Sequence, residues 1–264
     1  MAKPVPSSVA VPAAQHLMVR YAKRGKMRFA SHRDVARAFE RGVRRVGLPI
    51  AYSAGFTPHP KISYAGGAPT GVASEAEYLT LALTSPQAAD LVRERLDAAL
   101  PDGIDVIDVT EDALLPGSSV GTQEASVWRV ELPGIEPEAA ARAVAGFLAL
   151  AEAPVERLTD KGVRRMDARG AVAEMAVVGP PLHPAAGTDA ATAGPESDDR
   201  RVAVTSQHDC AILRMVVLHL APAVRPEDVL TALRAEYGIV PSSPPLTTRL
   251  AQGQLGSLTG TAVS

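Results

Sequence analysis

The chain has 264 residues, of which 46% are hydrophobic, so it is long enough for one large domain or two small ones with a sizeable core. Its single cysteine, Cys210, excludes an intrachain disulfide framework and any cysteine-based metal cage built from this chain alone. The net charge is only -2, yet the segment from Arg20 to Lys61 holds eleven Lys and Arg residues against two acidic ones, a net charge of +9. Such a basic segment in an otherwise acidic chain indicates an anionic partner, of which nucleic acid is the commonest.

The N-terminal residues 1–15 contain three prolines and lack the continuous apolar core of a signal peptide, so we expect them to form a disordered tail. No apolar run approaches the roughly 18 to 20 residues needed to cross a bilayer. We therefore expect a cytoplasmic protein with no membrane partner.

The first half of the chain predicts an alternation of strands and helices. Alternating apolar residues predict a strand over 16–22, with a continuation through 26–30. Ser31 then begins a helix, whose apolar positions recur with a period of 3.6 residues at Val35, Ala38, Phe39, Gly42, Val43 and Val46. After a loop-rich stretch over 51–74, the patterns predict a strand over 76–84, a helix over 85–101 and a strand over 104–110.

The second half repeats this order. We predict a strand over 126–133, a helix over 136–153, extended segments over 155–179, a strand over 210–220 and a helix over 225–238. Two successive β-α-β-β-α-β patterns predict an α+β fold with two ferredoxin-like halves, over 16–115 and 125–240, whose sheets are packed or aligned. The Pro, Ala, Gly and Asp-rich residues 180–201 are expected to form a flexible insertion, and residues 241–264 a second disordered tail.

The predicted helix after Ser31 carries a stripe of arginines opposite its apolar face. With Val35 at zero on a helical wheel, the apolar side chains centre near about 10°, and the arginines fall between about 160° and 280°. The stripe consists of Arg33, Arg37, Arg41, Arg44 and Arg45. A solvated helix face would account for charges in this place, but five arginines with only Glu40 beside them cannot be explained by salt bridges along the helix. Arginine also binds phosphate oxygens in a bidentate manner, so we expect an anion or RNA surface here, with Arg28 beside it.

Two residues at the start of this helix have the spacing of a capping box. Ser31 and Asp34 match S-x-x-D, so we expect them chiefly to satisfy free amides, as structural support. An aspartate occupied in this way is a poor general base. Between them, His32 lies at a helix N-terminus, where the helix dipole favours an anion and disfavours a protonated imidazole. It is either a border histidine satisfied by the backbone or a neutral proton donor at an anion site.

The loop that follows, AYSAGFTPHPKIS, is expected to be stiff. Gly55 can adopt a positive φ, while Pro58 and Pro60 fix their own φ and push the residues before them toward extended geometry. This arrangement presents His59 and Lys61, with Tyr52 nearby, as candidate substrate contacts. Further along, Glu75 and Glu77 stand at the start of the next predicted strand. We expect these two acids to support the site by neutralising arginines or by contributing ligands.

Known catalytic motifs are missing from the sequence. There is no G-x-x-x-x-G-K-[ST], no G-x-G-x-x-G after a strand and no G-x-S-x-G, so nucleotide hydrolysis, dinucleotide redox chemistry and serine hydrolysis lack support. No histidine pair has metal-ligand spacing, and we expect no metal in this chain. The catalytic residues stay unknown, with His32, His59 and Lys61 as candidates.

The segment RFASHRDVARAFERGVRRVGLPIAYSAGFTPHPKISYAGGAPTGVASEAEYL resembles the opening signature of an uncharacterised, radical-SAM-linked protein family. Members occur fused behind a cobalamin-binding radical-SAM protein or, in actinobacteria, as separate chains. The resemblance is dense over 16–84 and weaker over 85–240. It implies a radical-SAM partner that carries an iron-sulfur cluster, S-adenosylmethionine and cobalamin, but it supplies no catalytic residues. Because the cluster needs three cysteines and this chain has one, we expect no cofactor in this chain and no radical-SAM reaction by it alone.

Three hypotheses follow for the function. The first is an accessory protein that binds structured RNA, such as tRNA or rRNA, through the arginine-rich helix and presents it to a partner enzyme for modification or processing. The second is a metal-independent endoribonuclease that uses His32, His59 and Lys61, by fold-level analogy with CRISPR repeat-processing nucleases. The third is a protein-protein scaffold without a nucleic-acid role. The sequence leaves open whether the protein is an enzyme.

Overall fold

A computed structural model describes residues 11–54, 57–111, 123–159, 162–179 and 210–259. The first half of the chain consists of β1 (Gln15–Lys23), the 3-10 helix η1 (Gly25–Phe29), α1 (His32–Arg45), β2 (Ile62–Ala65), β3 (Ala73–Leu83), α2 (Ala89–Ala99) and β4 (Ile104–Glu111). The second half consists of β5 (Ala125–Pro133), α3 (Pro137–Ala149), β6 (Pro154–Thr159), β7 (Gly162–Asp167), β8 (Val172–Val178), β9 (Cys210–Leu218), α4 (Pro226–Tyr237), β10 (Leu246–Gly253) and α5 (Leu255–Leu258). The predicted α+β class is confirmed.

One eight-stranded sheet runs through both halves. Its order is β4-β1-β3-β10-β5-β9-β8, with β2 paired to β3, and β6 and β7 form a separate hairpin. The halves meet where β3 and β10 run parallel, with Ala73 opposite Thr248 and Ser74 opposite Arg249. The remaining pairs of neighbouring strands in the sheet are antiparallel. The two sheets that the sequence predicted are therefore joined edge to edge. The assignment of each half as ferredoxin-like stays a prediction.

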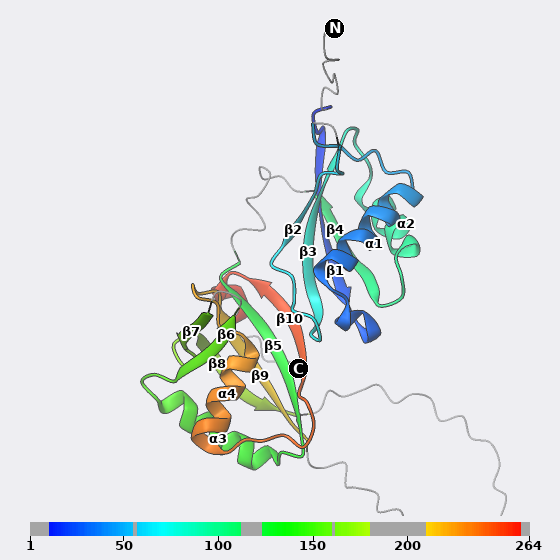
Figure 1. The fold of residues 1–264 in the computed structure, drawn as a ribbon. Coiled ribbons are helices and arrows are strands. Elements are labelled where there is room, and N and C mark those ends of the chain that lie inside the picture. Colours follow the sequence, from blue (N-terminus) through cyan, green and yellow to red (C-terminus); the bar gives the residue numbers. More distant parts are fainter. Residues whose placement is uncertain (1–10, 55–56, 112–122, 160–161, 180–209, 260–264) are drawn as a thin grey trace, which may run out of the picture.

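Helices α1 and α2 pack on strands of the first half, and helices α3 and α4 pack on strands of the second half (Figure 1). One core cluster packs Phe39 of α1 and Leu96 of α2 against strands β1, β3 and β4. A second cluster packs Phe147 of α3 and Val229 of α4 against β5, β8 and β9. On the opposite face, the short helix α5 places Leu258 against β5 and β9. The two clusters leave the junction of β3 and β10 between them.

The expected disordered tail over 241–264 was wrong for its middle part. Residues 246–253 form β10, a central strand, and α5 follows it. The buried side chains of β10 are Thr247, Arg249 and Gln252, so the strand lacks the apolar alternation by which strands are recognised. It is held by strand pairing and by partners that are distant in sequence, Glu77 and the Ala76 carbonyl.

The segment between β1 and the end of α1 differs from the sequence prediction in one place and confirms it in another. Residues 26–30 do not continue the first strand, because Gly25 has a φ of 51° and turns the chain into η1. The predicted helix after Ser31 is confirmed, and Val35, Ala38, Phe39, Gly42 and Val43 are buried as its periodicity indicated. The expected insertion over 180–201, Gly55 and residues 1–10 lie outside the described residues. Within the described parts of the chain, no helix is both long and apolar enough to span a membrane.

Candidate functional site

The start of α1 is fixed by the predicted capping box. The backbone N–H of Asp34 donates to Ser31 Oγ at 3.3 Å, and the backbone N–H of Ser31 donates to Asp34 Oδ2 at 3.1 Å. The Ser31 hydroxyl also donates to Asp34 Oδ2 at 2.6 Å. These hydrogen bonds lower the pKa of the Asp34 carboxyl, with smaller contributions from Arg37 and Arg41. Asp34 is thus an ionised cap residue, as expected, and is poorly suited to act as a general base.

Four arginines of α1 form an exposed surface, which we call the α1 basic face. It consists of Arg33, Arg37, Arg41 and Arg44. Among the described residues, none of the four takes part in a salt bridge. Arg44 lies eleven positions after Arg33, which corresponds to roughly 16 Å of helix. The face therefore presents to solvent four positive charges that no salt bridge to a described residue neutralises.

The other two predicted arginines have structural partners. The guanidinium of Arg45 donates to the carbonyl of Ala99 at the end of α2, at 3.2 Å. Arg28 donates from Nε to the carbonyl of Gly71 at 2.7 Å, and its guanidinium lies 5.7 Å from the ring centre of Phe29. Part of the hydrogen-bonding capacity of both residues is therefore used within the fold.

The two predicted supporting acids neutralise arginines, but not those of α1. Glu75 forms a salt bridge with Arg24, which also contacts Asp105 at 2.9 Å. Glu77 is buried and pairs with Arg249 of β10. The positive charge of the α1 basic face is therefore left without an acidic partner from either residue.

The loop between α1 and β2 is folded back on itself. The N–H of Ser53 donates to the carbonyl of His59 at 2.9 Å, the N–H of His59 donates to Ser53 Oγ at 3.1 Å, and the N–H of Lys61 donates to the carbonyl of Ala51 at 2.8 Å. The side chains of Tyr52, His59 and Lys61 are exposed. Pro58 and Pro60 flank His59 in the sequence, and the stiffness of the loop stays a prediction.

The structure does not bring the three candidate catalytic residues together. His32 packs edge-on against Tyr64, with ring centres 5.1 Å apart, at the end of β2 that leads to Gly67. His59 and Lys61 precede the other end of β2, and a four-residue strand is roughly 13 Å long. Among the described residues, no hydrogen bond or ring contact joins His32 to either of them.

A row of polar side chains crosses the junction of the two halves on the helix-bearing face. Lys23 of β1, Glu77 of β3 and Arg249 of β10 are all buried, and Trp128 of β5 lies beside Arg249. Arg249 Nη2 donates to Glu77 Oε1 at 2.7 Å, and its guanidinium lies 5.3 Å from the centre of the Trp128 ring. Lys23 Nζ donates to the carbonyls of Ala68 and Pro69, at 3.1 and 3.2 Å. We call Lys23, Glu77, Arg249 and Trp128 the junction row.

Burial sets the ionisation of the lysine in this row. Desolvation lowers the pKa of Lys23, and the positive charges of Arg249 and Arg28 lower it further, while Glu77 opposes the shift. The Glu77 carboxylate is shared between Arg249 and the N–H of Ala68, which donates to Oε2 at 3.0 Å. The junction row is therefore held chiefly by charge-assisted hydrogen bonds within the fold.

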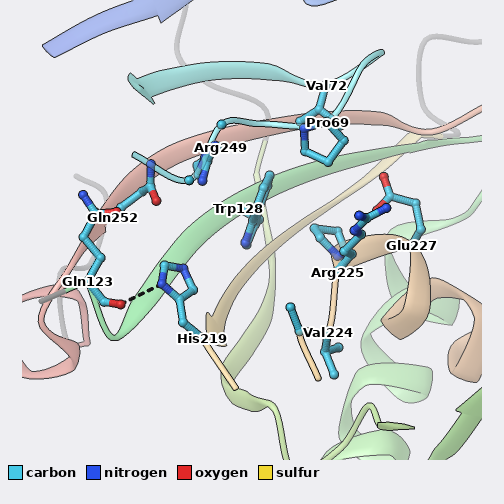
Figure 2. Close-up of a pocket in the computed structure, with 14 residues that line it drawn as sticks. Pro69, Val72, Gln123, Trp128, His219, Val224, Arg225, Glu227, Arg249 and Gln252 are labelled. Atoms are coloured by element: carbon cyan, nitrogen blue, oxygen red, sulfur yellow. Dashed lines mark hydrogen bonds between the residues drawn. The ribbon is translucent and has the colours of Figure 1, made fainter. Parts of the chain in front are cut away.

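Two neighbouring pockets open beside the junction row. The larger, which we call the junction pocket, has a volume of about 340 Å³ and is lined by Gly67, Trp128, His219, Arg225, Arg249 and Gln252, among others (Figure 2). The smaller has a volume of about 290 Å³ and lies between Lys23, Glu77 and His32. Gly67 lines both pockets, and a Cβ atom added to it would lie 3.5 Å from His32 Nδ1. The start of α1 and the junction pocket are thus neighbours.

His219 is held in its neutral form at the edge of the junction pocket. Its Nδ1–H donates to the carbonyl of Gln123 at 2.7 Å (Figure 2). Its Nε2 accepts from the Ser126 hydroxyl at 2.7 Å. Burial lowers the pKa of His219, the hydrogen bond to Gln123 opposes this shift, and the charge of Arg249 adds to it. Both ring nitrogens are therefore occupied by the protein.

The sequence interpretation singled out Glu77 but missed the other members of the junction row and the junction pocket. Trp128 and Arg249 meet only because β5 and β10 pair, whereas the sequence pattern assigns β10 to a tail. Among the residues that line the junction pocket, Arg225 has a place that the sequence alone indicates, because it immediately precedes the Pro-Glu-Asp start of α4. Across the described ranges, no group of three or more His, Cys, Asp or Glu residues is placed to hold a metal ion.

Comparison with known proteins gives a family for this chain. A model of the family described as "Uncharacterized protein conserved in bacteria (DUF2344)" matches residues 16–226. The matched region contains the α1 basic face, the loop with His59 and most of the junction pocket. The family description states neither an activity nor a partner. No curated protein matches the sequence.

Proposed function

The chain belongs to this family of uncharacterised bacterial proteins, and from its own residues we propose that it binds structured RNA, such as tRNA or rRNA, through the α1 basic face. The observation that carries the proposal is the set of four exposed arginines without salt bridges in a chain of net charge -2. Charges that only solubilise a helix are usually balanced in sign, whereas on α1 the arginines outnumber the acidic residues Asp34 and Glu40.

The chemistry of the face suits phosphate groups. Guanidinium groups bind phosphate oxygens in a bidentate manner, and contacts to phosphates supply most of the affinity of non-specific nucleic-acid binding. A rigid helix fixes the spacing of the four side chains, and α1 is anchored by its capping box and by the burial of Phe39. Double-stranded RNA is recognised mainly by shape and backbone, which does not require the aromatic residues of single-strand binding modules.

We propose a non-catalytic role for this chain, as an accessory protein. The three catalytic candidates do not converge, which favours RNA binding over the endoribonuclease hypothesis. The resemblance to radical-SAM-linked proteins supports a radical-SAM partner that carries the iron-sulfur cluster, S-adenosylmethionine and cobalamin. The single cysteine, Cys210, leaves such chemistry to that partner.

Filter binding with a fluorescent tRNA transcript at low salt tests the RNA proposal. The triple variant Arg37→Gln/Arg41→Gln/Arg44→Gln is expected to bind at least about 10-fold more weakly than the unaltered chain, because it removes three guanidinium groups that bind phosphates. The matched control is Arg142→Gln/Arg164→Gln/Arg234→Gln, which removes the same charge from exposed arginines of the second half. An equal decrease in affinity for both variants would show a non-specific charge effect and would overturn the proposal.

Affinity purification from a cell that encodes the chain tests the accessory role. We expect a protein with the three-cysteine radical-SAM motif to co-purify, and structured RNA to be found in the same fraction. Treatment with ribonuclease separates an RNA-bridged complex from a direct protein contact. Purification that yields protein partners but no RNA, together with no tRNA retention on filters, would favour the scaffold hypothesis.

A further inference from the structure

The junction pocket combines features that are suited to a nucleotide. Its volume of about 340 Å³ is within the range of small-ligand pockets, at the lower end. Figure 2 shows Trp128 among polar side chains that come from separate strands and loops: Gln123, His219, Arg225 and Gln252. An aromatic ring with a few convergent polar groups is the usual composition of a site that orients one planar ligand.

Two guanidinium groups in this pocket are not fully used by the protein. Arg249 is buried, and although its Nη2 is paired with Glu77, its Nε has no hydrogen-bond partner among the described residues. Such an unsatisfied buried donor costs free energy and calls for an acceptor. Arg225 is exposed at the rim and forms no salt bridge within the described parts of the chain, although Glu227 lines the same rim. The pocket therefore has one cation in its wall and one at its mouth.

Glycines and neutral polar groups form further parts of the junction pocket wall. Gly66 and Gly67 form part of the pocket wall, and a Cβ atom on Gly66 would meet no heavy atom within 4 Å. The side-chain amide groups of Gln123 and Gln252 line the pocket and offer hydrogen bonds without charge. Neutral donors and acceptors suit the edge of a nucleobase, while an exposed guanidinium suits its phosphate.

We propose that the junction pocket binds a single nucleotide unit, with the base against Trp128 and the phosphate toward Arg225. The source is either a free nucleoside 5′-monophosphate or an unpaired nucleotide of a bound RNA. This site goes beyond the α1 basic face, because none of its contacts involves α1. A single unpaired nucleotide seated here would give the protein a means to recognise RNA structure next to a phosphate-binding surface.

The chain offers a direct probe, because Trp128 is its single tryptophan. The full chain is titrated with each of the four nucleoside 5′-monophosphates, and Trp128 fluorescence is excited outside the nucleotide absorption band. Equilibrium dialysis with the same nucleotides measures binding independently of any fluorescence change. We expect saturable binding with a change in Trp128 emission for at least one nucleotide, and no comparable binding of inorganic phosphate.

The variant Arg225→Gln is expected to weaken nucleotide binding at least about 10-fold, since it removes a charge-assisted hydrogen bond to the phosphate. The matched control is Arg234→Gln on the same helix, which does not line the pocket and is expected to bind normally. Equal affinity for inorganic phosphate and for nucleotides would overturn the proposal, because the base would not be recognised.

A second arm separates the two sources of the nucleotide. An RNA hairpin with one unpaired nucleotide is compared with a fully paired duplex, again by Trp128 emission. A change with the hairpin alone supports an RNA-borne nucleotide, and a change with monophosphates supports a free one. If neither free nucleotides nor the hairpin bind in this pocket, the proposal fails. The triple α1 variant is expected to bind monophosphates as the unaltered chain does, because its altered residues do not line the junction pocket. A failure of the RNA proposal can therefore be distinguished from a failure of the nucleotide proposal.

Discussion

The α1 basic face and the junction row use the same kinds of charged residue in opposite ways. On α1, four arginines stand in solvent without salt bridges to any described residue. In the junction row, Arg249 and Lys23 are buried, and they donate hydrogen bonds to Glu77 and to backbone carbonyls, respectively. An exposed charge adds little to stability, whereas a buried charge must be paired. The arginines of the α1 basic face are therefore available for a ligand, whereas the charged residues of the junction row join the two halves.

The largest expected effect comes from removing Arg249. Arg249→Met leaves Glu77 buried without its cation, so we expect the free energy of unfolding to fall by about 3 to 5 kcal/mol. Urea denaturation followed by circular dichroism measures the decrease. The double variant Glu77→Gln/Arg249→Met removes both charges and is expected to be destabilised by less than the sum of the single variants.

A small decrease in the free energy of unfolding for Arg249→Met would contradict the structural role of the junction row. If this variant is no less stable than Arg37→Gln, which removes an exposed arginine, the junction row does not hold the halves together. The expected change for Arg37→Gln is within about 0.5 kcal/mol in either direction.

A medium effect is expected at the start of α1. Ser31→Ala removes the hydroxyl that accepts from the Asp34 N–H, so the free energy of unfolding should fall by about 1 kcal/mol. Ser31→Thr keeps an acceptor and serves as the control. A decrease as large as that of Arg249→Met would mean that the anchoring of α1, and not the junction row, dominates the stability of the first half.

The smallest expected effect is a dependence of stability on pH. The pKa of His219 is lowered from 6.5, so its neutral form is favoured by the fold and its contribution is fully present above pH 6.5. Stability should fall as the pH falls from 6.5 toward the lowered pKa of the folded state. His219→Asn is expected to show less of this fall, as measured by urea denaturation at several pH values.

A histidine whose ring makes no hydrogen bond to a described residue provides the control for this dependence. The control variant is His59→Asn, measured over the same pH range. An identical profile for the unaltered chain and for His219→Asn would contradict the assignment of His219 as a neutral residue held by Gln123 and Ser126.

How much the sequence could predict depended on whether the signals were local. The helix after Ser31 follows from its apolar period and its S-x-x-D spacing, and the structure confirms both the helix and the cap. The exposure of the arginine stripe follows from the same helical wheel. These features lie within fifteen residues of each other, so the chain itself carries the information.

The junction could not be predicted because its signals are distant in sequence. Arg249 lies 172 residues from Glu77, and Gln252 lies 176 residues from the Ala76 carbonyl to which it donates. In isolation, the polar residues of LTTRLAQG are typical of an exposed segment, and the prolines that precede them also favour a loop. The pairing of β10 with β3 and β5 buries Thr247, Arg249 and Gln252. The same pairing places Arg249 and Gln252 in the wall of the pocket beside Trp128.

The most direct test of RNA binding by α1 is the dependence of affinity on salt. In a logarithmic plot of the tRNA binding constant against salt concentration, each phosphate that the protein neutralises contributes roughly 0.7 to 0.9 to the steepness of the slope. We expect the slope of Arg37→Gln/Arg41→Gln/Arg44→Gln to be shallower by about 2 to 3 than that of the unaltered chain, with the second-half control unchanged. An unchanged slope in the α1 variant, or no retention of tRNA at low salt by the unaltered chain, would contradict RNA binding by this face.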